Sequence, residues 1–94
     1  MTLTHHVREK MQERLITPKD INKTLTEGKK KYKNNRIIYS YDIFIVVVTL
    51  DETTIVTAHY RSDITNTIRS IAERLNISFK EAATKYFRLF KTAI

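Results

Sequence analysis

The stretch RIIYSYDIFIVVVTLDETTIVTAHYR, residues 36–61, decides the fold of this chain. Within it, Arg36–Tyr41 and Thr53–Arg61 are rich in β-branched and aromatic residues, and Ile43–Leu50 is a nearly unbroken apolar run of a strand's length. A two-residue acidic turn separates the last two segments. Because such short connections join antiparallel neighbours, we predict a meander of three strands with a buried middle strand.

Two helices are predicted before the meander. Residues 4–15 carry apolar side chains at steps of four, which is typical of an amphipathic helix. Thr17 fits an N-cap and Pro18 the first position of a second helix, and Gly28 is a typical C-terminal stop. The charged segment Lys29–Lys33 is predicted as a loop that leads into an edge strand.

Two more helices are predicted after the meander. Residues 63–75 have one apolar side, and Asn76 suits the end of that helix. Ser78 and Glu81 have the spacing of a capping box, which starts a fourth helix. The predicted fold class is therefore α+β: two N-terminal helices, a three- to four-stranded antiparallel β meander and two C-terminal helices.

Composition excludes several classes of protein. With 94 residues, 41% of them apolar, the chain is long enough for one domain with a modest core. Cysteine is absent, which excludes disulfides, thiol catalysis and cysteine-ligated zinc. The N-terminus has no apolar run of the signal-peptide kind, and the longest apolar run is far too short to cross a bilayer. We therefore expect a cytoplasmic protein with no membrane partner.

The positive charge of the chain is concentrated. The formal net charge is +7, and residues 29–36 contain five basic side chains and no acidic one. A concentrated basic patch attracts polyanions, and RNA is the partner that we expect. The alternative is a solvated basic loop that keeps the protein soluble. The candidate nucleic-acid-binding residues are Lys29, Lys30, Lys31, Lys33, Arg36, Tyr39, Tyr41 and Arg61.

A second group of cations lies on the predicted helix 4–15. His6, Lys10 and Arg14 are spaced four apart and span an arc of about 80° beside the apolar stripe. Such groups at the border between core and solvent could line a half-buried site. The alternative is an ordinary solvated face on which Lys10 and Arg14 pair with nearby glutamates such as Glu9 and Glu13.

The last predicted strand contains a further histidine near its end. Partial alternation places Ile55, Thr57 and His59 on one face of this strand. Tyr39 and Tyr41 likewise share a face of an earlier strand. Exposed tyrosines on a sheet can stack unpaired bases, although tyrosines in strands are more often packing residues.

The segment THHVREKMQERLIT, residues 4–17, resembles the opening of a small domain-of-unknown-function family related to the RelE-type and colicin-type ribonuclease toxins. That opening reads approximately S-x-H-x-x-x-R-M-x-x-R-G-I-[ST]. The residues in register with it are Thr4, His6, Lys10, Met11, Arg14, Ile16 and Thr17. Lys10 stands where the family usually has arginine, and Leu15 where it usually has glycine. The resemblance extends over roughly residues 3–61.

This resemblance implies the fold of the barnase, EndoU, colicin and RelE types of ribonuclease, with N-terminal helices on an antiparallel sheet. It also implies RNA cleavage through transesterification by the 2′-hydroxyl, without a metal or a cofactor. Such cleavage needs a base, a cation beside the phosphate and an acid. We expect one domain over residues 1–94, with a ribonuclease-type core over 1–61 and a helical extension over 62–94. The candidate catalytic residues are His6, Arg14, Lys10 and His59.

Two other functions remain open. Ile71–Ser78 looks like the middle of a helix-turn-helix, so the chain could be a non-catalytic nucleic-acid-binding or regulatory protein of plasmid or phage origin. The aromatic last helix could instead dock an antitoxin or a second copy of the chain through Phe87 and Phe90. Catalysis requires the candidate residues to converge in one cleft, whereas docking requires an exposed apolar patch on residues 79–94.

Overall fold

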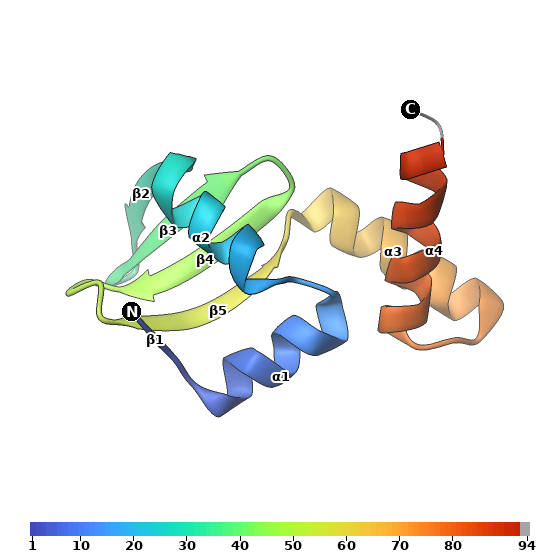
Figure 1. Ribbon diagram of the computed structural model, residues 1–94, viewed down its shortest axis with the longest axis horizontal. Helices are drawn as coiled ribbons and strands as arrows, with labels where there is room; N and C mark the ends of the chain where they lie inside the picture. Colours follow the sequence, from blue (N-terminus) through green and yellow to red (C-terminus); the bar gives the residue numbers. More distant parts are fainter. Residues whose placement is uncertain (93–94) are drawn as a thin grey trace.

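The computed structural model describes the backbone of residues 1–92 and the side chains of residues 1–89. Its elements, in chain order, are β1 (Thr2–Leu3), α1 (His5–Arg14), α2 (Pro18–Glu27), β2 (Lys29–Lys33), β3 (Arg36–Tyr41), β4 (Phe44–Thr49), β5 (Thr54–Tyr60), α3 (Ser62–Leu75) and α4 (Phe79–Thr92). The fold is α+β, as the sequence predicts, with helices before and after the main strands (Figure 1).

The predicted strand arrangement is wrong in two places. Thr2–Leu3 forms a short strand that pairs in parallel with β5, and Lys29–Lys33, expected as a loop, forms strand β2 antiparallel to β3. The described residues therefore make a five-stranded mixed sheet of order β1-β5-β4-β3-β2, not an antiparallel meander of three or four strands. The turn Asn34-Asn35 explains β2. Both of its residues have positive φ angles (51° and 58°), and such a turn folds the chain directly back into a hairpin.

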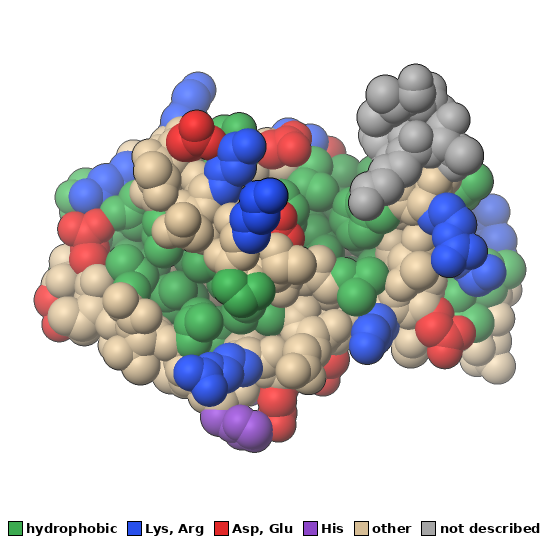
Figure 2. Space-filling view, in the orientation of Figure 1, with side chains coloured by type: hydrophobic (Ala, Val, Ile, Leu, Met, Phe, Trp, Pro, Cys, Tyr) green, Lys and Arg blue, Asp and Glu red, His purple; other side chains and the backbone are tan. Residues whose placement is uncertain are grey.

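The helices α1 and α2 cover the same face of the sheet (Figure 1). α2 packs on β3 and β4, and α1 lies along β5. The core joins this face to α3 and α4; its largest fully buried side chains are Tyr60, Ile37, Ile68, Val7, Val46, Val48 and Thr24. On the side seen in Figure 2, apolar side chains lie between α1 and α2, and charged side chains of both signs are scattered around them.

The ends of α2 lie where the sequence predicts them. The Thr17 hydroxyl accepts a hydrogen bond from Asp20 N at 3.2 Å, and the Asp20 carboxylate accepts one from Thr17 N at 2.9 Å, which completes a capping box. Gly28 ends the helix with a φ of −75°, so a left-handed conformation is not the reason for glycine. A Cβ there would lie 2.3 Å from the Thr24 carbonyl oxygen and 2.9 Å from that of Ser40. Glycine is needed because the backbones of α2 and β3 approach so closely.

The break between α3 and α4 also lies where the sequence predicts it. Asn76 ends α3 in the left-handed conformation with a φ of 53°. The Ser78 hydroxyl then accepts a hydrogen bond from Glu81 N at 3.1 Å, as an N-cap does. α4 packs on α3 and on α1, where Ala82 and Ala83 are fully buried. The small side chains allow close approach of these helices.

A bulge in β5 changes the faces that the sequence predicts. Thr57 and Ile55 pair with consecutive residues of β4, so Val56 is an extra residue in the strand. Ile55 is therefore buried under the helices, whereas Thr57 and His59 lie on the opposite face. Simple alternation along the strand placed Ile55, Thr57 and His59 on one face. It missed the bulge because the bulge arises from the pairing with β4 and not from the sequence of β5 itself.

The helix α1 ends at Leu15, which has a left-handed backbone conformation with φ 57° and ψ 38°. A residue with a Cβ pays about 1–2 kcal/mol for this conformation, whereas glycine adopts it freely. The partly buried Leu15 side chain packs against the core, which offsets part of that cost. The resembled family usually has glycine at this position.

We expect Leu15→Gly to be more stable than Leu15→Ala by about 1 kcal/mol, because both lose the leucine packing but only alanine keeps the strain. Urea unfolding of the two variants measures the difference. The matched control is the same pair at Gln12, an exposed position inside α1, where glycine should be less stable than alanine by about 1 kcal/mol. If the glycine variant differed in stability from the alanine variant in the same direction at both positions, backbone strain at Leu15 would be contradicted.

Candidate functional site

The candidate site lies at the open edge of β5. β1 pairs only with Thr54 and Ile55, so within the described residues no strand lies beside the rest of this edge. The end of α1 takes that place, and Arg14 Nη1 donates a hydrogen bond to the Ala58 carbonyl oxygen at 2.8 Å. In return, the Tyr60 hydroxyl donates to the Arg14 carbonyl oxygen. These two hydrogen bonds join the end of α1 to the end of β5.

Tyr60 connects the elements around this edge. It is 1% exposed, and its ring centre lies 5.7 Å from that of Phe44 and 5.4 Å from that of Phe87. Burial raises the pKa of Tyr60, so its hydroxyl remains protonated and can donate. The Tyr60 carbonyl oxygen lies 3.2 Å from Thr65 Oγ1 and 2.9 Å from His59 Nδ1. One residue thus holds β5 to α1, α3 and α4.

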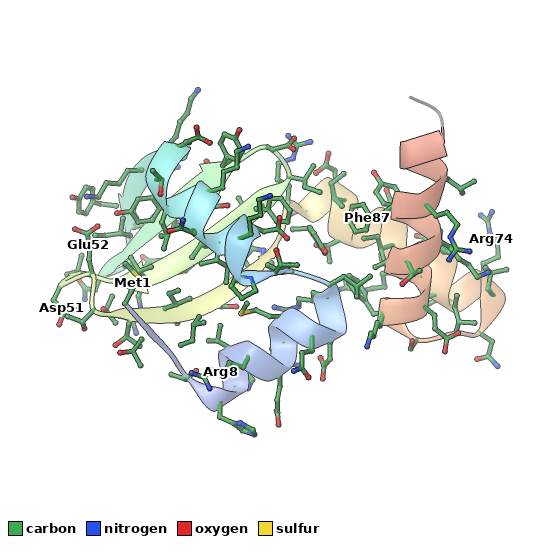
Figure 3. All side chains as sticks on the ribbon, viewed as in Figure 1. Met1, Arg8, Asp51, Glu52, Arg74 and Phe87 are labelled. Atoms are coloured by element: carbon green, nitrogen blue, oxygen red, sulfur yellow. The ribbon has the colours of Figure 1, made fainter. Side chains whose placement is uncertain are left out.

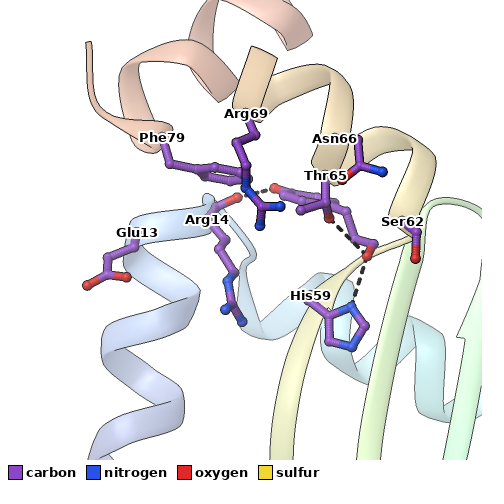
Figure 4. Close-up of a pocket in the computed structure, with 9 residues that line it drawn as sticks. Glu13, Arg14, His59, Ser62, Thr65, Asn66, Arg69 and Phe79 are labelled. Atoms are coloured by element: carbon purple, nitrogen blue, oxygen red, sulfur yellow. Dashed lines mark hydrogen bonds between the residues drawn. The ribbon is translucent and has the colours of Figure 1, made fainter. Parts of the chain in front are cut away.

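A cavity of about 490 Å³ lies beside this junction. Its walls come from the end of α1, the end of β5, α3 and the start of α4 (Figure 4). The lining residues are Glu13, Arg14, His59, Tyr60, Ser62, Thr65, Asn66, Arg69 and Phe79. Two candidates from the sequence, Arg14 and His59, therefore meet in one cavity.

His59 has one fixed and one free ring nitrogen. A carbonyl oxygen can only accept, so the contact with Tyr60 assigns the proton of the neutral imidazole to Nδ1. Nε2, which has no hydrogen-bond partner among the described residues, then carries a lone pair. An imidazole held in this way can take a proton from a substrate hydroxyl.

Two guanidinium groups share the cavity with His59. Figure 4 shows Arg69 pointing from α3 toward Arg14 and His59, and its guanidinium has no ion-pair or hydrogen-bond partner in the described part of the chain. Glu13, the acidic lining residue, points away from these cations in Figure 4 and pairs with Lys10 at 3.3 Å. The positive charge in the cavity is thus suited to a phosphate group.

The register of the sheet places a row of cations on the same face as His59. Pairing across β4 and β3 connects His59 in one row with Lys29, on the face opposite α1 and α2. Lys31, Lys33 and Arg36 lie on this face by the same pairing, and all four basic side chains are exposed. Because β2 is three strands from β5, the row begins about 14 Å from the imidazole.

Three of the predicted RNA-binding residues lie on the other face instead. Lys30 Nζ is 3.3 Å from the Glu52 carboxylate, and Tyr39, only 7% exposed, donates to the same carboxylate. Hydrogen bonds from Tyr39 and Lys30 lower the pKa of Glu52, and the bond to Glu52 raises that of Lys30. Tyr41 is half-buried, with Lys23 Nζ 5.7 Å from its ring centre. These tyrosines are packing residues and not exposed stacking platforms.

The helix α1 brings only one of its three predicted site residues to the cavity. Arg14 lines it, whereas His6 is exposed and does not, and Lys10 pairs with Glu13 at the surface. His6 and Arg14 lie on the same side of the helix but about 12 Å apart along its axis. The structure therefore does not bring His6 to Arg14, and the histidine beside Arg14 is His59.

The remaining predicted residues lie outside the cavity. Arg61 follows β5 and pairs with Asp63 at 3.0 Å, and this hydrogen bond lowers the pKa of Asp63. Figure 3 shows Phe87 pointing from α4 toward α3 and the end of the sheet, where its half-buried ring packs on Tyr60. Phe87 thus contributes to packing within its own chain. The side chain of Phe90 lies outside the described residues.

Arg69 and its neighbours on α3 are site residues that were not predicted from the sequence. A signal was present, because Ser62, Thr65, Asn66 and Arg69 have the spacing i, i+3, i+4, i+7 of one helix face. A polar helix face is usually solvated, so the spacing alone does not indicate a site. Only the position of α3 beside β5 turns this face toward the cavity.

Comparison with known proteins gives no relative for this chain: no family model, no curated protein and no solved structure matches it. None of the helices in residues 1–92 is long and apolar enough to cross a membrane. No group of three or more potential metal ligands converges among the described side chains. The features of this chain that bear on function are therefore its cavity and its cationic face.

Removing the Tyr60 hydroxyl tests the bond between α1 and β5. We expect Tyr60→Phe to lower the free energy of unfolding by about 1 kcal/mol, because the partly buried Arg14 carbonyl oxygen loses its donor. Denaturant unfolding measures the change. Tyr32→Phe, at a tyrosine that is 64% exposed, is the matched control and should leave stability unchanged. Equal stability of all three proteins would mean that this bond contributes nothing.

Proposed function

We propose that this protein is a metal-independent endoribonuclease of the toxin type, which acts in the cytoplasm and cleaves RNA in the cavity between α1, β5 and α3. The observation that carries the proposal is the meeting of one imidazole and two guanidinium groups, from three separate elements, in one cavity. His59 transfers the proton, and Arg14 and Arg69 bind the phosphate. A guanidinium can bind phosphate through two parallel hydrogen bonds, which also orients it.

The proposed reaction is a transesterification. His59 Nε2 takes the proton of the 2′-hydroxyl, the 2′-oxygen attacks the adjacent phosphorus, and the bond from phosphorus to the 5′-oxygen breaks. The leaving 5′-oxygen takes a proton from water, and the hydroxide that remains takes the proton from the His59 imidazolium. The products are a 2′,3′-cyclic phosphate and a 5′-hydroxyl, and His59 is neutral again. Arg14 and Arg69 stabilise the negative charge that grows on the phosphate oxygens.

The cationic face of the sheet supports RNA as the substrate. Lys29, Lys31, Lys33 and Arg36 are exposed on the same face as His59, so a strand bound in the cavity can continue along them. Phosphate contacts of this kind give affinity without sequence preference. The left-handed conformation of Leu15, where the resembled ribonuclease-related family usually has glycine, is a further point in favour.

A second candidate is RNA binding without cleavage. Among the residues that line the cavity, His59 carries the one imidazole, and Glu13 points away from it in Figure 4. A site with one proton-transferring group needs water as its acid, which makes turnover slower. The same cations would bind RNA equally well in a regulatory protein that does not cleave it.

Incubation of the purified protein with RNA in EDTA separates the two candidates. We expect the wild type to produce fragments that end in 2′,3′-cyclic phosphate, and His59→Ala to lower the cleavage rate by about 100-fold or more. His6→Ala, the matched control at the exposed start of α1, should cleave like the wild type. Loss of cleavage in His6→Ala alone would refute the assignment to His59. Intact RNA with every protein would refute the ribonuclease.

Salt dependence of RNA binding tests the cationic face. If Lys29, Lys31 and Lys33 each contact a phosphate, their joint replacement by glutamine lowers the slope of log K against log salt by about 2 for single-stranded RNA. Fluorescence anisotropy between 50 and 200 mM salt, roughly the range in which such slopes are measured, gives this value. The matched control is Lys30→Gln, on the same strand but the opposite face, which should leave the slope unchanged. Equal slopes for the wild type and all variants would exclude this face as an RNA-binding surface.

A further inference from the structure

The polar face of α3 forms one wall of the cavity. Ser62, Thr65, Asn66 and Arg69 all line it, and the apolar residues on the other side of the helix, such as Ile68, face the core. The neighbouring start of α4 adds Phe79, so five of the nine lining residues come from α3 and α4. These helices belong to the segment beyond residue 61, outside the part of the chain with the ribonuclease resemblance.

The polar groups of this wall differ in whether they already have partners. Thr65 donates its hydroxyl hydrogen to the Tyr60 carbonyl oxygen at 3.2 Å, so it helps to hold α3 in place. The side chains of Asn66 and Arg69, in contrast, have no hydrogen-bond partner among the described residues. A side-chain amide offers donors and an acceptor side by side, which can pair with the edge of a nucleobase.

Phe79 adds an apolar surface to the same wall. It is half-buried, so its ring is held by the core and still lines the cavity, and Figure 4 shows it beside Arg69. Aromatic rings and guanidinium planes are the surfaces on which proteins stack unpaired bases. A stacking surface and a free amide therefore lie on one wall, next to the two guanidinium groups.

We infer that α3 and α4 form a base-recognition subsite, in which Phe79 stacks one unpaired base and Asn66 hydrogen-bonds its edge while Arg14 and Arg69 hold the adjacent phosphate. This inference rests on the proposed binding of RNA in the same cavity. A base inside a duplex has neighbours on both faces and cannot offer one to Phe79. A cavity of about 490 Å³ also has the size of a small-molecule site and not of a duplex groove. The subsite therefore selects single-stranded RNA.

Binding of an RNA that cannot be cleaved tests the subsite separately from catalysis. The probe is a fluorescent 2′-O-methyl RNA 12-mer, single-stranded or in a blunt duplex, measured by anisotropy with the full chain. We expect the wild type to bind the single strand about tenfold more tightly than the duplex. Asn66→Ala and Phe79→Leu should each weaken single-strand binding several-fold, up to about tenfold, and leave duplex binding unchanged.

The controls separate this inference from the proposed function. Asn22→Ala, at an exposed asparagine of α2 outside the cavity, should bind both probes like the wild type. Asn66 is exposed, so Asn66→Ala keeps the fold even if Phe79→Leu, at a partly buried ring, does not. RNA binding with no preference for the single strand, or with a preference that Asn66→Ala keeps, would overturn the subsite alone. No affinity of the wild type for either probe would overturn the subsite and the proposed function together.

Discussion

The pair of hydrogen bonds between the end of α1 and the end of β5 determines the geometry of everything around it. Arg14 satisfies a carbonyl group that has no strand partner, and the buried Tyr60 hydroxyl satisfies a carbonyl group at the helix end. Each of the two elements therefore donates a hydrogen bond to a backbone carbonyl oxygen of the other. Because α3 starts directly after β5 and Thr65 bonds to the same tyrosine, the third wall of the cavity is fixed by this junction as well. A cavity built in this way is organised before any ligand enters it.

Local signals in the sequence predicted the helices well, and long-range pairing explains what was missed. Thr17 and Asn76 determine helix ends through their own backbone and side-chain preferences, so a reader of the sequence can find them. A strand of two residues at the N-terminus has no such signal, because only β5 makes it a strand. The lysine-rich strand Lys29–Lys33 has poor intrinsic propensity and forms because the turn after it brings it alongside β3.

Only part of the candidate site was predictable from the sequence, and its assembly was not. Arg14 and His59 stood out in the sequence, yet nothing in their spacing said that they would meet. The four-residue spacing correctly put His6 and Arg14 on the same side of α1. It did not take into account that the two residues lie far apart along the helix axis. From the sequence, Tyr39 could either stack bases or pack, and in the structure it is buried and bonded to Glu52. Arg69 was missed because its role depends on where α3 lies and not on α3 itself.

The extra residue in β5 makes the length of that strand as important as its composition. Val56 inverts the inward and outward sense of every later position, so that Tyr60 is buried and the imidazole lies on the open side. Deletion of Val56 would hardly alter the hydrophobicity or the charge of the strand. It would nevertheless exchange the faces on which the Tyr60 and His59 side chains lie. Point substitutions at this position are mild by comparison. Substitutions in the middle of β5 should therefore be tolerated more readily than insertions or deletions there.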